Sequence, residues 1–101
     1  MILSHWRHKP RGGFRGYVNV TLEVGLVIPD VRIFVGQYGP FTVLPETPVL
    51  LDGKVKRDIN NKPVFMPQLK WESRARAAKF STEVIRELAR QYPDALSAKA
   101  A

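Results

Sequence analysis

The chain has 101 residues, no cysteine and a formal net charge of +7, with 45% apolar and 25% charged residues. This composition is ordinary for a globular protein, and the length fits a single domain with one modest core. The lack of cysteine excludes disulfide frameworks, thiolate zinc sites and cysteine nucleophiles. The apolar runs are shorter than a membrane span, and the N-terminus lacks the apolar segment of a signal peptide, so we expect a cytoplasmic protein without a membrane partner.

Positive charge is concentrated at the two ends of the chain. Residues 1–17 carry four basic and no acidic side chains, residues 18–58 have a net charge of −1, and residues 59–101 have a net charge of +4. Ends of this kind can hold an anionic partner without burying charge in the core.

Residues 1–16 show neither a strand period nor a helix period, and they contain a Gly-Gly pair within PRGGFRG. We therefore expect a flexible basic tail, followed by a single domain over residues 17–101. The tail is either a solubilising terminus or an arginine-glycine segment that grips phosphates while an aromatic ring stacks on a base. The candidates are Arg11 and Arg15 for phosphate contacts, and Trp6 and Phe14 for stacking.

Strands with one buried face are predicted for residues 17–24 and 31–35, because apolar side chains occupy every second position. Glycine and proline at positions 36–40 interrupt the second pattern before residues 41–44 resume it, so we expect a hairpin with a loop of about four residues. Pro29 cannot donate a ladder hydrogen bond, which favours an edge position or a kink there.

A second hairpin is predicted at Asp52-Gly53, because both central residues of a type I′ turn need a positive φ and this pair readily adopts it. The outgoing strand carries Lys54, Lys56 and Arg57. The two lysines share one face of that strand, since side chains alternate along it.

Residues 59–71 carry two prolines and several large apolar side chains without a steady period. We expect an ordered excursion that covers an apolar surface or makes a dimer contact, and its aromatic side chains could also stack on nucleobases. The side chains concerned are Val64, Phe65, Met66, Leu69 and Trp71.

One long helix is predicted from Ser73 to Gln91. Ser73 is a suitable N-cap, and Pro93 prevents continuation beyond Tyr92. Six apolar side chains fall within one sector of the helical wheel, and this sector must pack on the sheet. They are Ala77, Phe80, Val84, Ile85, Leu88 and Tyr92.

The opposite flank of this helix is basic. Its five basic side chains are Arg74, Arg76, Lys79, Arg86 and Arg90. Glu83 and Glu87 lie between them at spacings that allow weak ion pairs with Lys79 and Arg90, so a solvated face is one interpretation. The excess of positive over negative charge favours the other interpretation, a surface that contacts phosphates.

No catalytic motif is readable in the chain. His5 and His8 both lie in the expected tail without a further ligand candidate nearby, so a metal site is disfavoured. Nothing resembles a P-loop or a dinucleotide fingerprint. We expect no enzymatic activity, no cofactor and no small-molecule substrate; a small enzyme with a site assembled across a dimer interface is the alternative in that class.

The spacing within residues 30–45 resembles the stage V sporulation protein G (SpoVG) family, which carries a similar order of aspartate, arginine, two glycines and proline after a first strand. The D-G turn and the R-D pair of that family are matched at residues 52–53 and 57–58, and the resemblance covers about residues 17–92. The matching residues of the first segment are Asp30, Val31, Arg32, Ile33, Gly36, Gly39, Phe41 and Pro45.

This resemblance implies an α+β fold, with a small antiparallel β-sheet of hairpins followed by one long C-terminal helix, assembled as a homodimer through its strands. It also implies sequence-tolerant binding of DNA or RNA in bacteria, linked to regulation of gene expression, septation or sporulation. The family binds largely through basic residues at the C-terminal helix, and Arg74, Arg76 and Lys79 best fit that role here. The N-terminal extension and the long connection over residues 60–71 depart from the family pattern.

We therefore expect a homodimeric regulator that binds DNA or RNA and has no enzymatic activity. The alternative is a protein-protein interaction module with no direct nucleic-acid role, in which the basic surface favours an acidic partner. The candidate phosphate contacts are Arg74, Arg76, Lys79, Arg86, Arg90, Lys54, Lys56, Arg57, Arg11 and Arg15.

Overall fold

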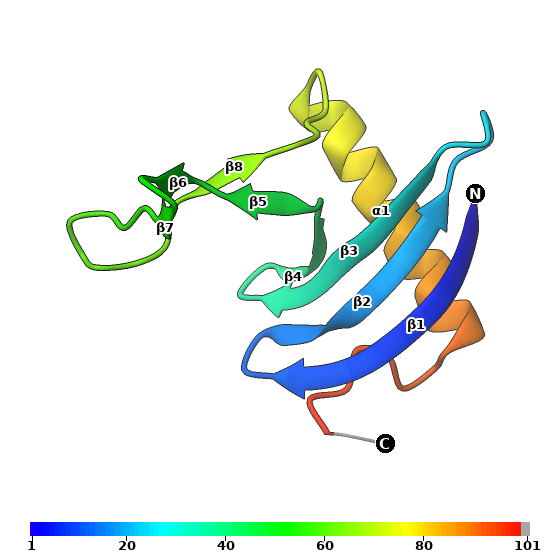
Figure 1. Ribbon diagram of the computed structural model, residues 1–101. Helices are drawn as coiled ribbons and strands as arrows, with labels where there is room; N and C mark the ends of the chain where they lie inside the picture. The colour runs from blue at the N-terminus through cyan, green and yellow to red at the C-terminus, as the bar shows by residue number, and fades with distance from the viewer. Residues whose placement is uncertain (100–101) are drawn as a thin grey trace.

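The computed structural model describes residues 1–99 and has an α+β fold, in which one helix covers one face of a four-stranded antiparallel sheet (Figure 1). The helix α1 (Arg74–Gln91) lies behind the sheet in this view. This architecture confirms the predicted sheet of hairpins followed by a long C-terminal helix. The strands lie in the sheet in sequence order, as β1 (Ile2–Arg11), β2 (Phe14–Thr21), β3 (Val27–Gly36) and β4 (Gly39–Val43).

The core lies between α1 and the face of the sheet that turns toward it, called here the inner face. Every second residue of a strand points to this face, and Phe80, Val84, Ile85 and Leu88 of α1 pack against it. Tyr92, expected in the same apolar sector, is instead 38% exposed. The apolar residues that recur every second position in the strands and every 3.6 positions in the helix therefore form one core. Its fully buried side chains are Val18, Val20, Val31 and Ile33 from the sheet and Val84 and Leu88 from the helix.

The ends of α1 are those that its sequence predicts. The Ser73 side chain accepts a hydrogen bond from the backbone N–H of Arg76 at 3.2 Å, which is the geometry of an N-cap. At the other end the backbone N–H of Tyr92 donates to the carbonyl oxygen of Leu88 at 2.8 Å, and Pro93 follows. Within residues 1–99, no helix combines the length and the apolar character that crossing a membrane requires.

The expectation of a flexible tail over residues 1–16 is wrong. β1 is an edge strand of the sheet, and Leu3 lies in the core with 6% of its surface exposed. The pairing with β2 is irregular between Ser4 and Arg7, and His5 has a φ of +53°. This bulge changes which residues point inward, so the apolar alternation that announces a strand is absent from the sequence of this segment.

Tight turns join the strands. Gly12 and Gly13 form the two-residue turn between β1 and β2, so the Gly-Gly pair is a hairpin signal and does not mark a tail. The turn between β3 and β4 also has two residues, because Gly36 pairs directly with Gly39, and the predicted loop of about four residues is too long. Near Pro29 the pairing of β3 with β2 is irregular, which confirms the predicted kink. The alternative, an edge position, does not hold, because β3 is a central strand.

Residues 46–67 form a second unit, called here the hairpin lobe, which projects from the end of the sheet (Figure 1). Asp52 and Gly53 have φ of +52° and +76°, which confirms the hairpin predicted there. The radius of gyration is 14.7 Å, larger than the roughly 13 Å expected of a compact domain of this length, because the lobe projects. The lobe pairs β5 (Glu46–Pro48) with β8 (Phe65–Pro67), and β6 (Leu50–Leu51) with β7 (Lys54–Val55).

The hairpin lobe has no core of its own. None of its residues is buried, and backbone hydrogen bonds such as that from the N–H of Val64 to the oxygen of Lys56, at 2.9 Å, hold it together. Several large apolar side chains remain in solvent, among them Leu50 and Leu51, both 62% exposed, and Ile59, which is 99% exposed. These side chains are available for contact with another polypeptide.

The excursion over residues 59–71 covers the core at one position. The Trp71 ring lies 4.9 Å from the Phe80 ring and packs against the core. Phe65 and Met66 remain 47% and 54% exposed on the hairpin lobe. These two residues of β8 therefore do not cover the core, and the dimer contact expected as the alternative for them stays a prediction.

Candidate nucleic-acid interface

The structure distributes the ten predicted binding residues over three places. The first group lies on α1, the second on the hairpin lobe and the third on the hairpin formed by β1 and β2. The lobe projects away from α1 (Figure 1), so the three groups do not form one patch. In that order they are Arg74, Arg76, Lys79, Arg86 and Arg90; Lys54, Lys56 and Arg57; and Arg11 and Arg15.

All five basic side chains of α1 are exposed, but carboxylates accompany them. Arg76 forms an ion pair with Glu72, and Arg90 forms the predicted ion pair with Glu87. Hydrogen bonds from Arg90 and Gln91 lower the pKa of Glu87 from 4.5 to about 2. This carboxylate therefore keeps its charge near neutral pH and offsets that of Arg90.

A groove of about 540 Å³ lies between α1 and the end of β2. Lys79 and Arg86 line it from the helix, and three carboxylates line it as well, those of Glu23, Glu83 and Glu87. The groove is thus mixed in charge. It attracts a polyanion less strongly than the basic side chains of the helix alone would.

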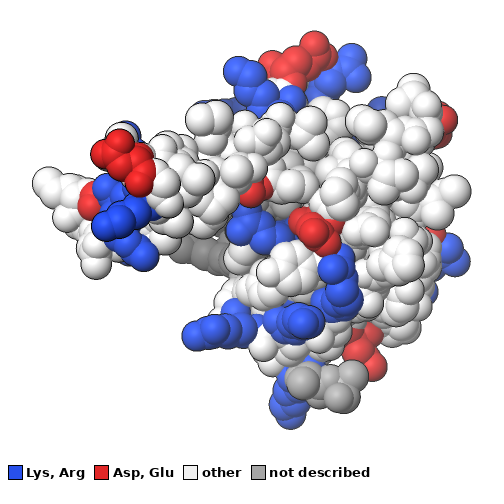
Figure 2. Space-filling model, viewed as in Figure 1, with Lys and Arg blue, Asp and Glu red and all other residues white. Residues whose placement is uncertain are grey.

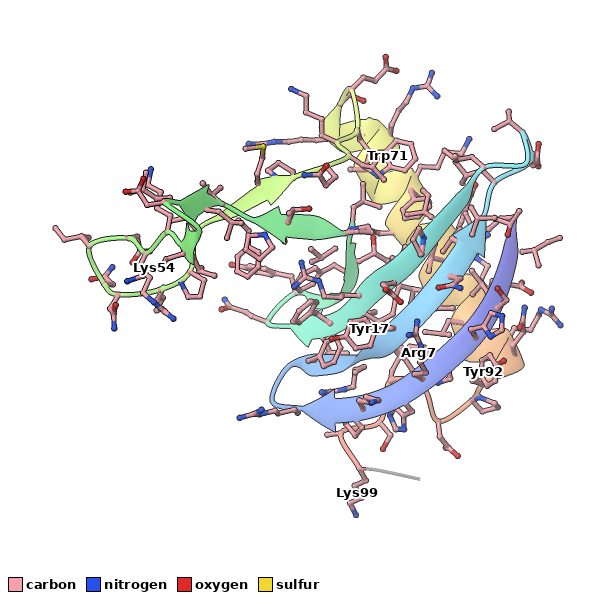
Figure 3. The ribbon with its side chains drawn as sticks, in the orientation of Figure 1. Arg7, Tyr17, Lys54, Trp71, Tyr92 and Lys99 are labelled. Carbon is pink, nitrogen blue, oxygen red and sulfur yellow. The ribbon has the colours of Figure 1, made fainter. Side chains whose placement is uncertain are left out.

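The hairpin lobe presents its basic side chains to solvent. Lys54, Lys56 and Arg57 are all exposed, and Figure 3 shows Lys54 on the part of the lobe remote from the sheet. The Arg57 guanidinium donates a hydrogen bond to the carbonyl oxygen of Asn61 at 3.1 Å, so it also orders the turn that follows. Asp52 and Asp58 are exposed on the same lobe, so its surface is mixed in charge with a small excess of positive charge (Figure 2).

Arg15 has a structural role and does not belong to a phosphate-binding surface. Only 8% of its surface is exposed. Its guanidinium donates hydrogen bonds to the carbonyl oxygens of Leu96 at 2.9 Å, Gly12 at 2.5 Å and Phe14 at 3.1 Å. The bond to Leu96 fastens the hairpin formed by β1 and β2 to the segment that follows α1, and the other two order the turn of the hairpin. Arg11, at the end of β1, is exposed.

The outer face of the sheet, opposite α1, carries a feature that the sequence analysis missed. Four aromatic rings follow one another across β2, β3 and β4, with neighbouring centroids 5.0, 5.3 and 5.5 Å apart. The last two rings, of Phe34 and Phe41, are stacked with 10° between their planes. In spatial order this aromatic row consists of Tyr17, Phe14, Phe34 and Phe41.

The signal for the aromatic row was present in the sequence of β3. Because Val31 and Ile33 point inward, Arg32 and Phe34 must point outward together. The register then places Phe34 opposite Phe41 and Arg32 opposite Tyr17. An aromatic residue at an outward position carries information that an analysis of the apolar alternation alone overlooks.

Arginine side chains border the aromatic row. The Arg7 guanidinium lies 5.3 Å from the centre of the Tyr17 ring, within the range of a cation–π contact, and it pairs with Asp30 at 2.6 Å (Figure 3). Arg32 pairs with Glu46 at 2.5 Å. Both arginines are partly exposed and can exchange these carboxylates for other anions at small cost, since ion pairs of this kind contribute little to stability.

β1 adds further positive charge to the outer face. His8 points inward, because its ring lies 3.0 Å from the carbonyl oxygen of Ser97, so Arg7 and Lys9 on either side of it point outward. Both are exposed, as is Arg11. Figure 2 shows Lys and Arg side chains following β1 along the edge of this face.

A hollow of about 240 Å³ lies between the outer face and the hairpin lobe. Tyr17 and Arg32 line it from the sheet, and Phe65 lines it from β8 of the lobe. The side chains of Asp30 and Glu46 also reach its wall. Two aromatic rings and one guanidinium thus border a space beside the aromatic row.

The chain was compared with protein-family models, with curated proteins and with solved structures, and none of them matches it. The function proposed for this chain therefore depends on its own fold and surfaces.

Proposed function

We propose that the protein is a homodimeric, cytoplasmic nucleic-acid-binding regulator without enzymatic activity, of the kind that the SpoVG resemblance implies. The observation that supports this proposal is the exposure of all five basic side chains of α1 in a chain of net charge +7. Contacts from arginine and lysine to phosphates give affinity with little choice of sequence. Arg74, Arg76 and Lys79, at the N-terminal half of α1, are the leading candidates for these contacts.

The hairpin lobe supports the dimeric part of the proposal. It has no buried residue, yet it exposes Leu50, Leu51, Ile59, Phe65 and Met66. A second copy of the chain that packs its own lobe against these side chains would supply the missing core. Sedimentation at several concentrations measures this: we expect a dimer, and a Leu51→Asp variant is expected to shift the equilibrium toward monomer.

Salt dependence tests the phosphate contacts. If about five contacts form on duplex DNA, the logarithm of the binding constant falls against the logarithm of the salt concentration with a slope of roughly −4.5. Fluorescence anisotropy with duplex DNA, single-stranded DNA and RNA across a salt series measures this slope. An affinity that does not change with salt would contradict the mechanism.

Charge reversal locates the contacts. Changing Arg74, Arg76 and Lys79 to Glu is expected to abolish retention of nucleic acid while the dimer stays intact. The matched control reverses three charges on the hairpin lobe and alters the net charge by the same amount. That control carries Lys54→Glu, Lys56→Glu and Arg57→Glu, and it is expected to weaken binding less. Equal losses in both variants would show a general charge effect, and retention by the helix variant would exclude α1 as the site.

A protein-protein interaction module is the second candidate function, and the exposed apolar surface of the hairpin lobe favours it. For this class, the lobe binds another polypeptide and the basic surface selects an acidic partner. A chain that binds neither DNA nor RNA at low salt, and that sediments as a monomer with its lobe exposed, would place this candidate first.

A further inference from the structure

We propose that the outer face of the sheet binds the unpaired bases of single-stranded nucleic acid, which stack on the aromatic row. The inference rests on the proposed function and deepens it: α1 contributes phosphate contacts that any nucleic acid satisfies, whereas the outer face selects strands whose bases are accessible. The rings that receive the bases are those of Phe34 and Phe41, with Tyr17 at the other end of the row.

The aromatic row has the accessibility that stacking requires. α1 covers only the inner face, so the rings on the outer face lie at the surface, and Phe41 is 43% exposed. The strands hold the rings in register, because Phe34 pairs with Phe41 across β3 and β4. A base that stacks on such a platform meets rings that are already ordered, which reduces the entropy cost of binding.

The hollow beside the aromatic row extends this platform. Phe65 of the hairpin lobe and Tyr17 of the sheet border a space of about 240 Å³, and Arg32 lies in its wall. A base in this space would meet an aromatic ring from each of two elements. The Arg32 guanidinium would donate hydrogen bonds to the polar edge of this base or to the adjoining phosphate.

The charge of the outer face identifies the occupant as an anionic strand. Arg7, Lys9, Arg11 and Arg32 border the row, and the carboxylates paired to two of them are those of Asp30 and Glu46. A second copy of this face would bring like charges together, whereas phosphates are complementary to them. A duplex satisfies the charges, but its base faces are stacked inside the helix and cannot reach the rings. Single-stranded nucleic acid satisfies both the rings and the charges.

The test compares two ligands that differ only in their bases. Wild-type protein is titrated with a short oligothymidylate and with an abasic strand of the same length, which carries the same phosphates. We expect the oligothymidylate to bind at least about 10-fold more tightly, since stacking of each base on an aromatic ring adds to the affinity. A 2-aminopurine base placed within the oligonucleotide is expected to lose fluorescence on binding, because stacking quenches it.

Two variants locate the stacking site. Phe34→Leu with Phe41→Leu keeps the apolar character of the outer face and removes the two rings that receive the bases, and it is expected to lose most of the preference for oligothymidylate. The control is Tyr38→Leu, which removes an aromatic ring that is 96% exposed at the turn between β3 and β4. The control is expected to keep the wild-type preference, and circular dichroism verifies that both variants are folded.

The outcomes separate this inference from the proposed function. Equal binding of the two ligands by wild-type protein would overturn the stacking site and leave phosphate binding intact. An undiminished preference for oligothymidylate in the Phe34, Phe41 variant would place stacking elsewhere and would also overturn the proposed site. Conversion of a dimer to a monomer by that variant would overturn it as well, because the face would then be a dimer contact. Failure of both ligands to bind would overturn the proposed function itself.

Discussion

The two faces of the sheet are built from the same strands but differ in what their side chains do. On the inner face Val18, Val20, Val31 and Ile33 have no exposed surface and pack beneath α1. On the outer face the same strands present partly exposed aromatic rings and Arg32. Since alternate residues of one strand point to opposite faces, the residues that stabilise the core and those of the proposed stacking site are neighbours along the chain.

This difference predicts that substitutions one residue apart in β3 differ strongly in their cost to stability. Ile33→Ala removes buried methyl groups and leaves a cavity, so the free energy of unfolding is expected to fall by about 2–5 kcal/mol. Phe34→Leu acts on a partly exposed side chain and is expected to cost about 1 kcal/mol. Urea denaturation at one fixed protein concentration measures both values, because the stability of a dimer depends on concentration.

Binding completes this comparison. At a temperature where both variants are folded, Ile33→Ala is expected to keep the preference for oligothymidylate over the abasic strand, and Phe34→Leu is expected to reduce it. Similar losses of stability in the two variants would show that the outer face is part of the core. Similar losses of preference would show that recognition depends on the overall fold.

The sequence predicts the inner face well and the outer face poorly, for one physical reason. Burial of apolar side chains is repeated at every second position, so Val18 and Val20, or Val31 and Ile33, announce both the strand and its inner face. The aromatic row has no such repeat within one strand. Its members come from three strands, and only the register brings Phe14, Phe34 and Phe41 together.

β1 shows the limit of periodicity even within one strand. The bulge at His5 shifts the alternation, so Leu3 and His8 both point inward although they are an odd number of positions apart. Because the alternation is interrupted, the sequence of this segment predicts a flexible tail, and Arg15 within it is predicted to lie at the surface. The Gly12-Gly13 turn was the remaining clue, because two glycines between strands permit a tight hairpin.

Arg15 is the exception to the separation of the two faces, since it is a cation buried on the inner side. Arg15→Met keeps much of the volume but removes the donors to the carbonyl oxygens of Leu96 and Gly12, so we expect a loss of about 1–3 kcal/mol in the free energy of unfolding. The matched control is Arg11→Met, at an exposed position four residues earlier, with an expected change within about 0.5 kcal/mol.

Thermal and urea denaturation of both variants test this role of Arg15. Equal and small losses in the free energy of unfolding would contradict this role, and Arg15 would again be a candidate phosphate contact. A large loss confined to Arg15→Met would support its role as the link between the first hairpin and the segment after α1.

The smallest effect is expected on the exposed surface of α1, at the ion pair of Glu87 and Arg90. Because the folded pKa of Glu87, about 2, lies below its ordinary value of 4.5, the unfolded chain binds more protons between these two values. The stabilisation from this carboxylate is therefore complete above about pH 4.5 and is lost as the pH falls toward 2. Glu87→Gln should be slightly less stable than wild type near pH 6, and the difference should vanish near pH 2. An NMR titration of the Glu87 side chain measures the cause directly, and a midpoint near 4.5 would show that Arg90 and Gln91 do not hold the carboxylate in solution.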